Sequence, residues 1–283
     1  MPTSIKNKLI VLLLLPGALI VIIPMWLVIT GMFMDAAEAA QHFAPVLSST
    51  SGWADWPVFP QYPTLEPLVS LLLDTPAFFV MFWNTVKIVV PVLVGQVAVG
   101  APAAWALARY KFRGRQALYL LYIALMLMPF QVTMVPSYLT INRLGMMNTH
   151  WSIILPGIFS TFPVFIMVRF FGSIPEDTLE SAALDGAGSI RVFFYIGLPL
   201  GAPGILSAVV LGFIEYWNTI EQPLIFLKDK SLWPLSLWLP SAGLETLGIS
   251  LVASVIMLTP AILIFLFGQR YLEQGIHTAG LKE

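Results

Sequence analysis

Six long apolar runs divide this chain, and they restrict its fold more than any other feature of the sequence. A helix of about 20 apolar residues crosses the roughly 30 Å hydrocarbon core of a bilayer. Backbone groups inside a bilayer need internal hydrogen-bond partners, and the runs do not alternate as barrel strands do, so the sequence predicts helices. The expected spans are residues 9–33, 77–108, 118–139, 153–171, 198–227 and 247–267.

The composition supports a membrane protein and argues against other classes. Hydrophobic residues make up 58% of the 283 residues and charged residues 10%, whereas soluble domains carry about 25% charged residues. This leaves too little polar surface for a water-soluble globule and too little charge for a disordered chain. The formal net charge of −1 indicates no nucleic-acid partner, and the absence of cysteine excludes disulfides and thiolate sites. We therefore expect an all-α integral membrane protein in a lipid bilayer.

The first run could be a signal peptide or a permanent span. Lys6 and Lys8 precede it, and the segment 36–40 resembles a cleavage site. However, the run has about 25 apolar residues, whereas the core of a signal peptide has roughly 7–15. We expect residues 1–34 to hold an uncleaved transmembrane helix.

The distribution of positive charge predicts the orientation, because cytoplasmic loops carry an excess of Lys and Arg. With the N-terminus inside, ten of the fourteen Lys and Arg residues fall on the cytoplasmic side, and Arg143, Lys228 and Lys230 fall on the other. Lys87 lies within the second span. Six spans with both termini in the cytoplasm satisfy this asymmetry.

Residues 35–76 then form an extracytoplasmic loop, followed by a core domain over residues 77–283. The loop has five acidic residues, no Lys or Arg, and several aromatic residues, including Trp53 and Tyr62. Aromatic side chains at this depth form an interfacial belt in many membrane proteins. A contact surface for an external partner is the alternative.

The longest cytoplasmic loop, residues 172–197, predicts a short helix. Pro175 suits a first helical turn, and Glu176 and Asp177 favour a helix N-terminus. Gly186 suits a helix end, because glycine accepts the left-handed conformation found there. A second amphipathic stretch, residues 190–196, would lie along the membrane surface. Composition alone leaves open that the loop only connects two spans.

The order of residues in this loop carries a family resemblance. Glu-Ser-Ala-Ala-Leu-Asp-Gly-Ala at 180–187, with Leu-Pro at 198–199, resembles the cytoplasmic signature of binding-protein-dependent ABC importer permeases. That signature is Glu-Ala-Ala, three residues and Gly, and Ser181 replaces its first Ala. Over residues 78–282 the chain also resembles the carbohydrate branch of the family. The segments that carry this second resemblance are 104–109, 112–114, 128–132, 135–136, 144–149, 154–156, 217–218, 223–224, 269–271 and 275–282.

The resemblance implies a permease subunit in a bacterial inner (plasma) membrane that imports a sugar or oligosaccharide by alternating access. Its partners would be a second, non-identical permease, a cytoplasmic ATPase dimer and an extracytoplasmic solute-binding protein. The chain has no Gly-x-x-x-x-Gly-Lys-Ser/Thr motif to hold ATP phosphates. We therefore expect no enzyme activity and no bound cofactor in this chain, with ATP and Mg²⁺ used by the ATPase. We also expect no metal site, because His42, His150 and His277 are scattered along the sequence. The residues implied in ATPase docking are Glu180, Ser181, Ala182, Ala183, Asp185, Gly186 and Ala187.

Polar residues within the spans are candidates for the solute path, because they are costly in a bilayer. Glu215 and Asn218 share a helix face at i, i+3, and aromatic residues beside them suit a sugar ring. A structural ion pair of Lys87 with Glu215 or Glu221 is an equal alternative. Other solutes, such as a polyol or glycerol phosphate, and an ion-coupled transporter also remain open. The full candidate set is Lys87, Gln131, Glu215, Tyr216, Trp217, Asn218 and Glu221.

Overall fold

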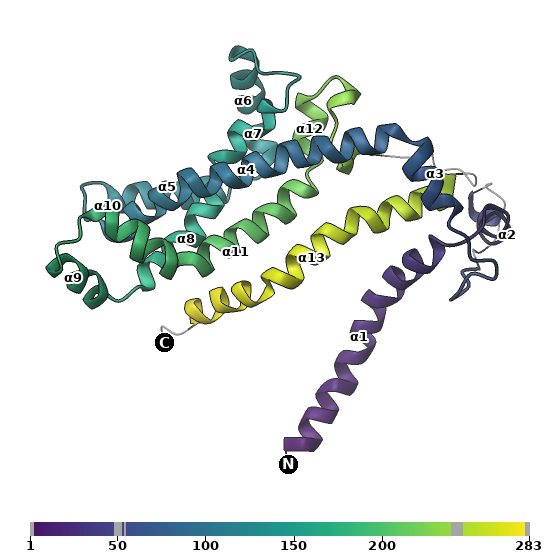
Figure 1. Ribbon diagram of the computed structural model, residues 1–283, viewed down its shortest axis with the longest axis horizontal. Helices are drawn as coiled ribbons and strands as arrows, with labels where there is room; N and C mark the ends of the chain where they lie inside the picture. The colour runs from purple at the N-terminus through teal and green to yellow at the C-terminus, as the bar shows by residue number, and fades with distance from the viewer. Residues whose placement is uncertain (1–2, 48–52, 54, 239–245, 281–283) are drawn as a thin grey trace. The chain divides into compact units, whose positions relative to one another are not determined.

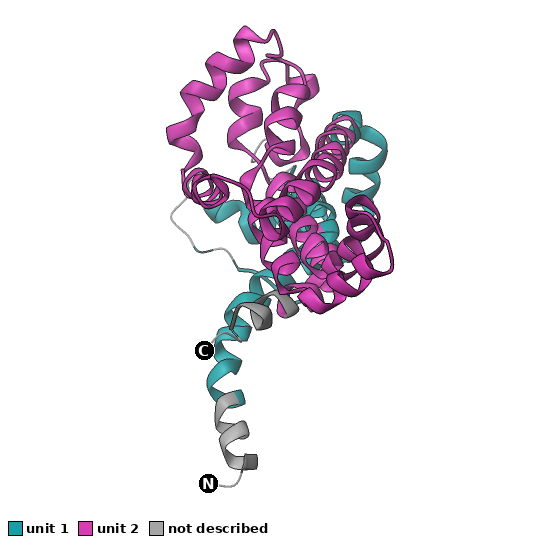
Figure 2. Ribbon diagram, turned by 90° about the vertical axis from the view of Figure 1, so that its left-hand side faces the viewer, with its two compact units in different colours: residues 1–79, 239–260 teal, residues 80–238, 261–283 magenta. Residues whose placement is uncertain are grey.

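The computed structural model describes residues 3–47, 53, 55–238 and 246–280 of the chain. The described residues are almost entirely helical, and one isolated bridge joins Met34 and Pro63. The chain divides into two compact units, residues 1–79 with 239–260 and residues 80–238 with 261–283 (Figure 2). The expected all-α fold is confirmed at this level.

Five helical stretches are long and apolar enough to cross a membrane (Figure 1). They lie at Val11–Gly31 within α1 (Thr3–Gly31), in α4 (Pro76–Arg109), at Trp151–Ser173, at Ser189–Trp217 and at Leu247–Glu273 within α13 (Leu247–Gly280). The third of these joins α7 (Trp151–Ile158) and α8 (Thr161–Ser173). Each overlaps one of the runs expected from sequence.

The remaining run, residues 118–139, is a broken helix and not one straight span. Helix α5 (Arg115–Met126) and helix α6 (Phe130–Arg143) meet at an angle of 101°, and they count as a sixth span only if the bent pair is taken as one. Pro129 precedes α6 in an extended conformation. Proline has no N–H to donate and disfavours a helical residue before it, which explains a break that hydropathy does not reveal.

The fifth run also differs from the sequence prediction at both ends. Helix α11 (Leu198–Trp217) stops ten residues before the expected limit, and α12 (Glu221–Phe226) is separate. At its start, α10 (Ser189–Val192) and a π-helical turn (Phe193–Gly197) lead directly into α11, and the Leu198 N–H donates to the Phe193 carbonyl. Residues 190–196 therefore continue directly into α11 and do not form the separate stretch expected from sequence.

The first unit contains α1, α2 (Ala36–Leu47), α3 (Glu66–Asp74) and the first part of α13. Within the 35–76 segment, Glu38 is 6% exposed, and its carboxylate accepts hydrogen bonds from the backbone N–H groups of Gln61 and Tyr62 at 2.7 and 3.1 Å. Phe43 and Trp56 pack edge to face with ring centroids 4.7 Å apart. The described part of this segment is therefore folded around a buried carboxylate.

The described residues of the second unit include two apolar clusters. Helix α8 packs against α11 in one of them, where Gly201 leaves no room for a side chain, since a Cβ atom there would lie 2.3 Å from the Phe171 ring. Small residues that permit such close approach are typical of membrane helix pairs. We call this group the Trp105 cluster: Ala101, Ala104, Trp105, Leu107, Val164, Met167, Phe171, Ile174, Val192 and Ala208. The second group, the Trp217 cluster, contains Ile88, Val89, Val92, Ile153, Ile154, Tyr216, Trp217, Phe226 and Leu227.

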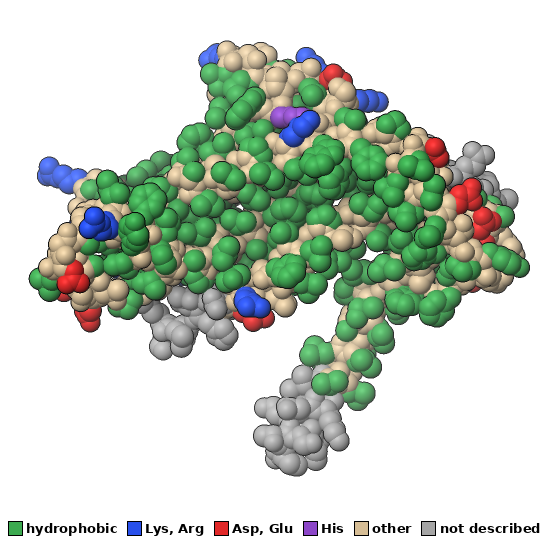
Figure 3. All heavy atoms as spheres, viewed as in Figure 1, with side chains coloured by type: hydrophobic (Ala, Val, Ile, Leu, Met, Phe, Trp, Pro, Cys, Tyr) green, Lys and Arg blue, Asp and Glu red, His purple; other side chains and the backbone are tan. Residues whose placement is uncertain are grey.

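The outside of the second unit is also apolar. Hydrophobic side chains cover most of the viewed face along α4 and α11 (Figure 3). Val90 and Val94 of α4 and Leu200 and Leu206 of α11 are among these exposed groups. A helix that is apolar both inward and outward suits a lipid environment.

Candidate functional site

The predicted short helix of the 172–197 loop is present as α9 (Glu176–Leu184). Pro175 lies just before it with φ −58° and ψ 137°, and Glu176 and Asp177 occupy its first turn. A fixed proline φ followed by acidic residues stabilises a helix start, where unpaired N–H groups favour negative charge. Ile174, immediately before Pro175, is buried in the Trp105 cluster and attaches this end of the helix to the core of the second unit.

Gly186 ends the helix with a complete Schellman motif. Its φ is +80°, the Ala187 N–H donates to the Ala182 carbonyl at 3.0 Å, and the Gly186 N–H donates to the Ala183 carbonyl at 3.0 Å. Glycine adopts this left-handed conformation without a Cβ penalty. A Cβ atom at Gly186 would meet nothing within 4 Å. A side chain there would strain the turn but would clash with no other part of the described chain.

The side chains expected to dock an ATPase are grouped on this exposed helix and its cap. Glu180, Ser181, Ala183, Asp185 and Gly186 are exposed, whereas Ala182 and Ala187 are half-buried against the Trp105 cluster. The Ser181 hydroxyl donates to the Asp177 carbonyl within the helix. Five of the seven predicted residues are therefore accessible, and the other two attach the helix to the core.

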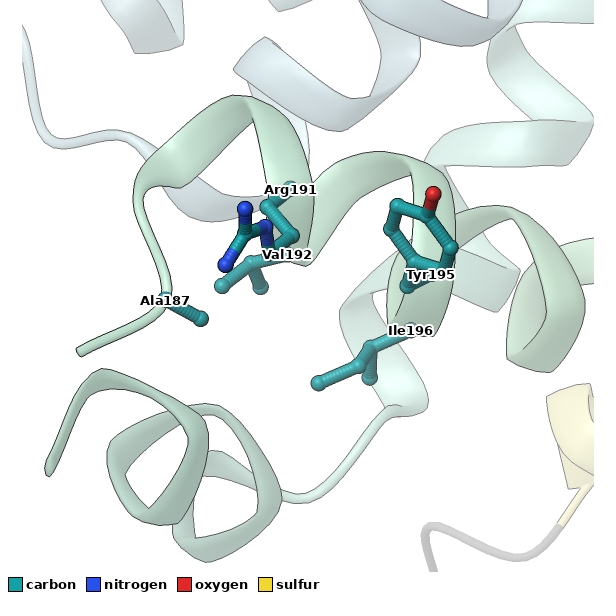
Figure 4. A pocket seen from close by; sticks show the side chains of 5 residues that line it. All are labelled: Ala187, Arg191, Val192, Tyr195 and Ile196. Carbon is teal, nitrogen blue, oxygen red and sulfur yellow. The ribbon is translucent and has the colours of Figure 1, made fainter. Parts of the chain in front are cut away.

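The structure adds exposed apolar residues around Gly186 that were not in the predicted docking set. Leu184 is 89% exposed, and Ile190 and Tyr195 are also strongly exposed. An open hollow of about 400 Å³ lies beside the helix cap, with Val192 at the end of α10 and Ile196 in the π-helical turn both extending toward the side of Ala187 (Figure 4). Apolar residues on both sides of a loop glycine were the available signal. The hollow is lined by Ala187, Arg191, Val192, Tyr195 and Ile196.

The candidate solute-path residues at the end of α11 do not form one group. Tyr216 and Trp217 are 4% and 5% exposed and belong to the Trp217 cluster, where Trp217 stacks on Phe213 with centroids 5.1 Å apart. Glu215 and Asn218 are exposed, and the Asn218 side-chain amide donates to the Ile214 carbonyl at 2.8 Å. The polar pair faces outward and the aromatic pair inward.

The other three candidates are also exposed. Gln131 of α6 donates its side-chain amide to the carboxylate of Glu221 in α12 at 2.7 Å. Lys87 is exposed on α4, and within the described residues no ion pair joins it to Glu215 or Glu221. The ion pair considered from sequence is therefore not formed in this structure.

Asn148 organises the connection between α6 and α7. It has φ +58°, and its side-chain carbonyl accepts the backbone N–H groups of Lys228 and Asp229 at 2.9 and 2.8 Å. The Asp229 carboxylate accepts the Ser231 N–H at 2.9 Å, and this hydrogen bond lowers the pKa of Asp229. These contacts give a structural role to one of the segments that carry the family resemblance.

Comparison with known proteins places this geometry in a family. Residues 96–278 match the family described as "Binding-protein-dependent transport system inner membrane component". The arabinooligosaccharides transport system permease protein AraQ of Halalkalibacterium halodurans is 28% identical over 227 residues, covering 77% of this chain and 80% of AraQ. The diacetylchitobiose uptake system permease protein NgcG of Streptomyces coelicolor is 28% identical over 271 residues, covering 93% and 85%.

A solved structure extends the match to the fold. A chain of a bacterial ABC transporter involved in the import of the acidic polysaccharide alginate aligns with a TM-score of 0.77 and 20% identity, over 95% of this chain and 96% of that one. The family match alone covers well over half of the sequence. This protein, with its several apolar helices, belongs to the multi-pass inner-membrane components of binding-protein-dependent transport systems.

Proposed function

We propose that this chain is a permease subunit of an ATP-driven importer and that it translocates a sugar or oligosaccharide by alternating access. Its membership of a binding-protein-dependent transport family supports the importer. The named substrates of two relatives, arabino-oligosaccharides and diacetylchitobiose, support the solute class. The observation that carries the proposal is α9, an exposed helix of small and acidic residues closed by Gly186.

The energy for transport comes from a separate ATPase dimer in this proposal. Helix α9 lies on the cytoplasmic side together with both termini, as the excess of Lys and Arg favours. Glu180, Ser181, Ala183, Asp185 and Gly186 contact one ATPase subunit, which binds the ATP and Mg²⁺. The chain itself is no enzyme and binds no cofactor.

The transport cycle follows from a two-state membrane assembly. Closure of the ATPase dimer on ATP displaces α9, and the spans that hold α9 tilt with it. ATP bound on the cytoplasmic side thereby changes which conformation the membrane spans adopt. A second, non-identical permease completes the pathway. An extracytoplasmic binding protein delivers the solute.

The exposed polar side chains near the ends of α11 and α12 supply the solute path in this proposal. Glu215, Asn218, Gln131 and Glu221 offer hydrogen-bond donors and acceptors that suit sugar hydroxyls. Lys87 contributes a single positive charge. The burial of Tyr216 and Trp217 favours a supporting role for these two aromatic residues, holding the end of α11 in place.

The test is a pull-down of the tagged chain from its native membrane in mild detergent, with mass spectrometry of the proteins recovered. We expect a P-loop ATPase and a second permease to accompany the wild-type chain. Gly186→Asp should reach the membrane but lose the ATPase. Gly145→Asp is the matched control, because Gly145 also has a positive φ (+67°) and open space around it but lies between α6 and α7.

Recovery of the chain alone, in a preparation that keeps other complexes intact, would contradict the proposal and favour an ion-driven transporter that uses Glu215 and Glu221. Equal loss of the ATPase in the two glycine variants would attribute the effect to general misfolding and would overturn the docking assignment.

A further inference from the structure

We propose that Trp105 and Arg109 of α4 form a clamp that holds both ends of the α9 segment, by which we mean residues 174–192. The clamp makes α9 move as one body with the end of α4. This inference rests on the proposed docking of α9 to an ATPase. It identifies α4 as the helix that receives the displacement of α9. It also gives a role to the segment 104–109, which carries part of the family resemblance.

Arg109 holds the leading end of the α9 segment. Its guanidinium Nη2 donates a hydrogen bond to the carbonyl of Ile174, the buried residue two positions before α9. The Arg109 Cζ atom lies 6.0 Å from the centroid of the Trp105 ring. Arginine keeps its charge at all accessible pH values, so this donor is permanent. A backbone carbonyl at the base of α9 is thereby attached to the last residue of α4.

Trp105 contacts the chain on both sides of the α9 segment and holds its trailing end through Phe193. Its ring packs edge to face on Phe171 at 5.4 Å and against Phe193 at 5.7 Å between centroids. Phe171 precedes the α9 segment, and Phe193 follows it in the π-helical turn. A Cβ atom at Gly197 would lie 2.8 Å from the Trp105 ring, so the ring occupies the space that a side chain would need.

The two clamp residues act from one face of one helix. They stand at i and i+4 along α4, and this spacing places side chains together. Aromatic groups packed at interior density transmit displacement instead of absorbing it, because such packing has discrete arrangements. A movement imposed on α9 therefore reaches α4 from both ends of the segment at once.

The clamp also gives a reason for a charged residue at position 109, at the end of α4. Arg109 Nε is buried without a hydrogen-bond partner, which is costly for a polar group. An apolar side chain would avoid this cost but would lose the bond to Ile174. The geometry therefore assigns Arg109 as a positioning residue, since it acts through the backbone of the α9 segment and touches no solute.

The test uses spin-label distances in the complete transporter, with ATPase and second permease, in lipid nanodiscs. The chain has no cysteine, so two introduced cysteines carry the only labels on it. One label replaces exposed Thr178 on α9 and the other replaces exposed Tyr110, the residue after Arg109. A second sample pairs Thr178 with one cysteine on the ATPase. Both samples are measured without nucleotide and after trapping with ATP, Mg²⁺ and vanadate.

We expect trapping to change the distance between Thr178 and the ATPase and to leave the distance between Thr178 and Tyr110 unchanged. Arg109→Gln and Trp105→Leu should broaden the distribution of the Thr178–Tyr110 distance at least about twofold while the ATPase still co-purifies. Arg109→Lys should give a Thr178–Tyr110 distribution of intermediate width. Arg169→Gln is the matched control, because Arg169 is exposed over Phe165 and contacts neither end of the segment. It should match the wild type.

The outcomes separate this inference from the docking proposal. A shift in the wild-type distance between Thr178 and Tyr110 as large as the shift to the ATPase would overturn the clamp and leave docking intact. Equally narrow distributions in Arg109→Gln and in the wild type would also overturn it. Failure of the ATPase to bind, or no change in any pair on trapping, would contradict the docking proposal and the clamp with it. The wild-type measurement decides the matter even if Trp105→Leu does not fold.

Discussion

The α9 segment and the end of α11 present their candidate residues in different ways. In α9 most of the predicted residues, such as Ser181 and Gly186, stand exposed on one short helix and its cap. At the end of α11 the predicted residues separate, with Glu215 outward and Trp217 in the core. The contiguous signature 180–187 therefore predicted residues that share one exposed surface. The candidates at 215–218, chosen because polar and aromatic residues lie close together in sequence, fall on two opposite faces of α11.

The largest effect should come from breaking the inward face of α11. Trp217→Ala removes a buried aromatic ring from the Trp217 cluster, and such truncations cost about 3–5 kcal/mol in the free energy of unfolding. Thermal unfolding in detergent measures the loss. Trp53→Ala is the control, because Trp53 is 96% exposed, and a surface change of this kind alters stability by only about 0.5 kcal/mol or less. Equal destabilisation by both changes would contradict the assignment of Trp217 to the core.

Gly186 offers a way to separate backbone strain from contact with a partner. Gly186→Ala should destabilise α9 by roughly 1 kcal/mol because alanine disfavours a positive φ. Gly186→Asn should fold nearly as well as the wild type, because asparagine accepts this conformation. Recovery of the ATPase in a pull-down measures contact with the partner. We expect the Asn variant to recover less ATPase than the wild type although its fold is intact. Full recovery would show that only the turn geometry matters.

The outward face of α11 should respond in function more than in stability. Glu215→Gln and Asn218→Ala alter exposed groups, so we expect the free energy of unfolding to change by about 0.5 kcal/mol or less. Uptake of labelled oligosaccharides by proteoliposomes should fall, because hydrogen bonds to the solute are lost. Loss of assembly with no selective defect in uptake would show that these residues are structural.

A smaller effect is expected from the hydrogen bond between Gln131 and Glu221. Both side chains are exposed, so removing this bond should cost no more than about 0.5 kcal/mol in the free energy of unfolding, the low end of the range for hydrogen bonds. A double-mutant cycle with Gln131→Ala and Glu221→Ala, read in unfolding and in uptake, gives the coupling between them. Coupling in uptake but not in unfolding would place the pair in the solute path, and the reverse would place it among the structural contacts.

The smallest effect should be the acid response at Asp229. Its pKa is lowered by the hydrogen bond from the Ser231 N–H, so its contribution to stability is present above the ordinary carboxyl pKa and is lost as the pH falls through the lowered value. Asp229→Asn should therefore differ from the wild type near neutral pH and converge with it in acid. Unfolding of both proteins between pH 7 and pH 3 checks this. A difference that grows toward low pH would contradict the assignment.

Local chemistry explains which features the sequence could predict. Gly186 ends α9 as expected, because a helix stop depends on residues within one turn. The 101° bend before α6 was missed, because Pro129 lies inside an apolar run whose hydropathy is continuous. The inward position of Tyr216 depends on packing against Gly157, which lies far away in the chain. The contacts of Trp105 and Arg109 with the α9 segment depend on long-range packing in the same way.

The Schellman cap of α9 has a consequence for the entropy of association. A helix of nine residues is marginal in water when isolated, because nucleation is unfavourable. Here the cap, and the buried attachment of Ile174, fix the helix before any partner arrives. In the proposed docking, binding would therefore lose little conformational entropy, and even a small contact surface could give useful affinity. A helix that is formed before binding would suit an ATPase that must stay attached while it opens and closes.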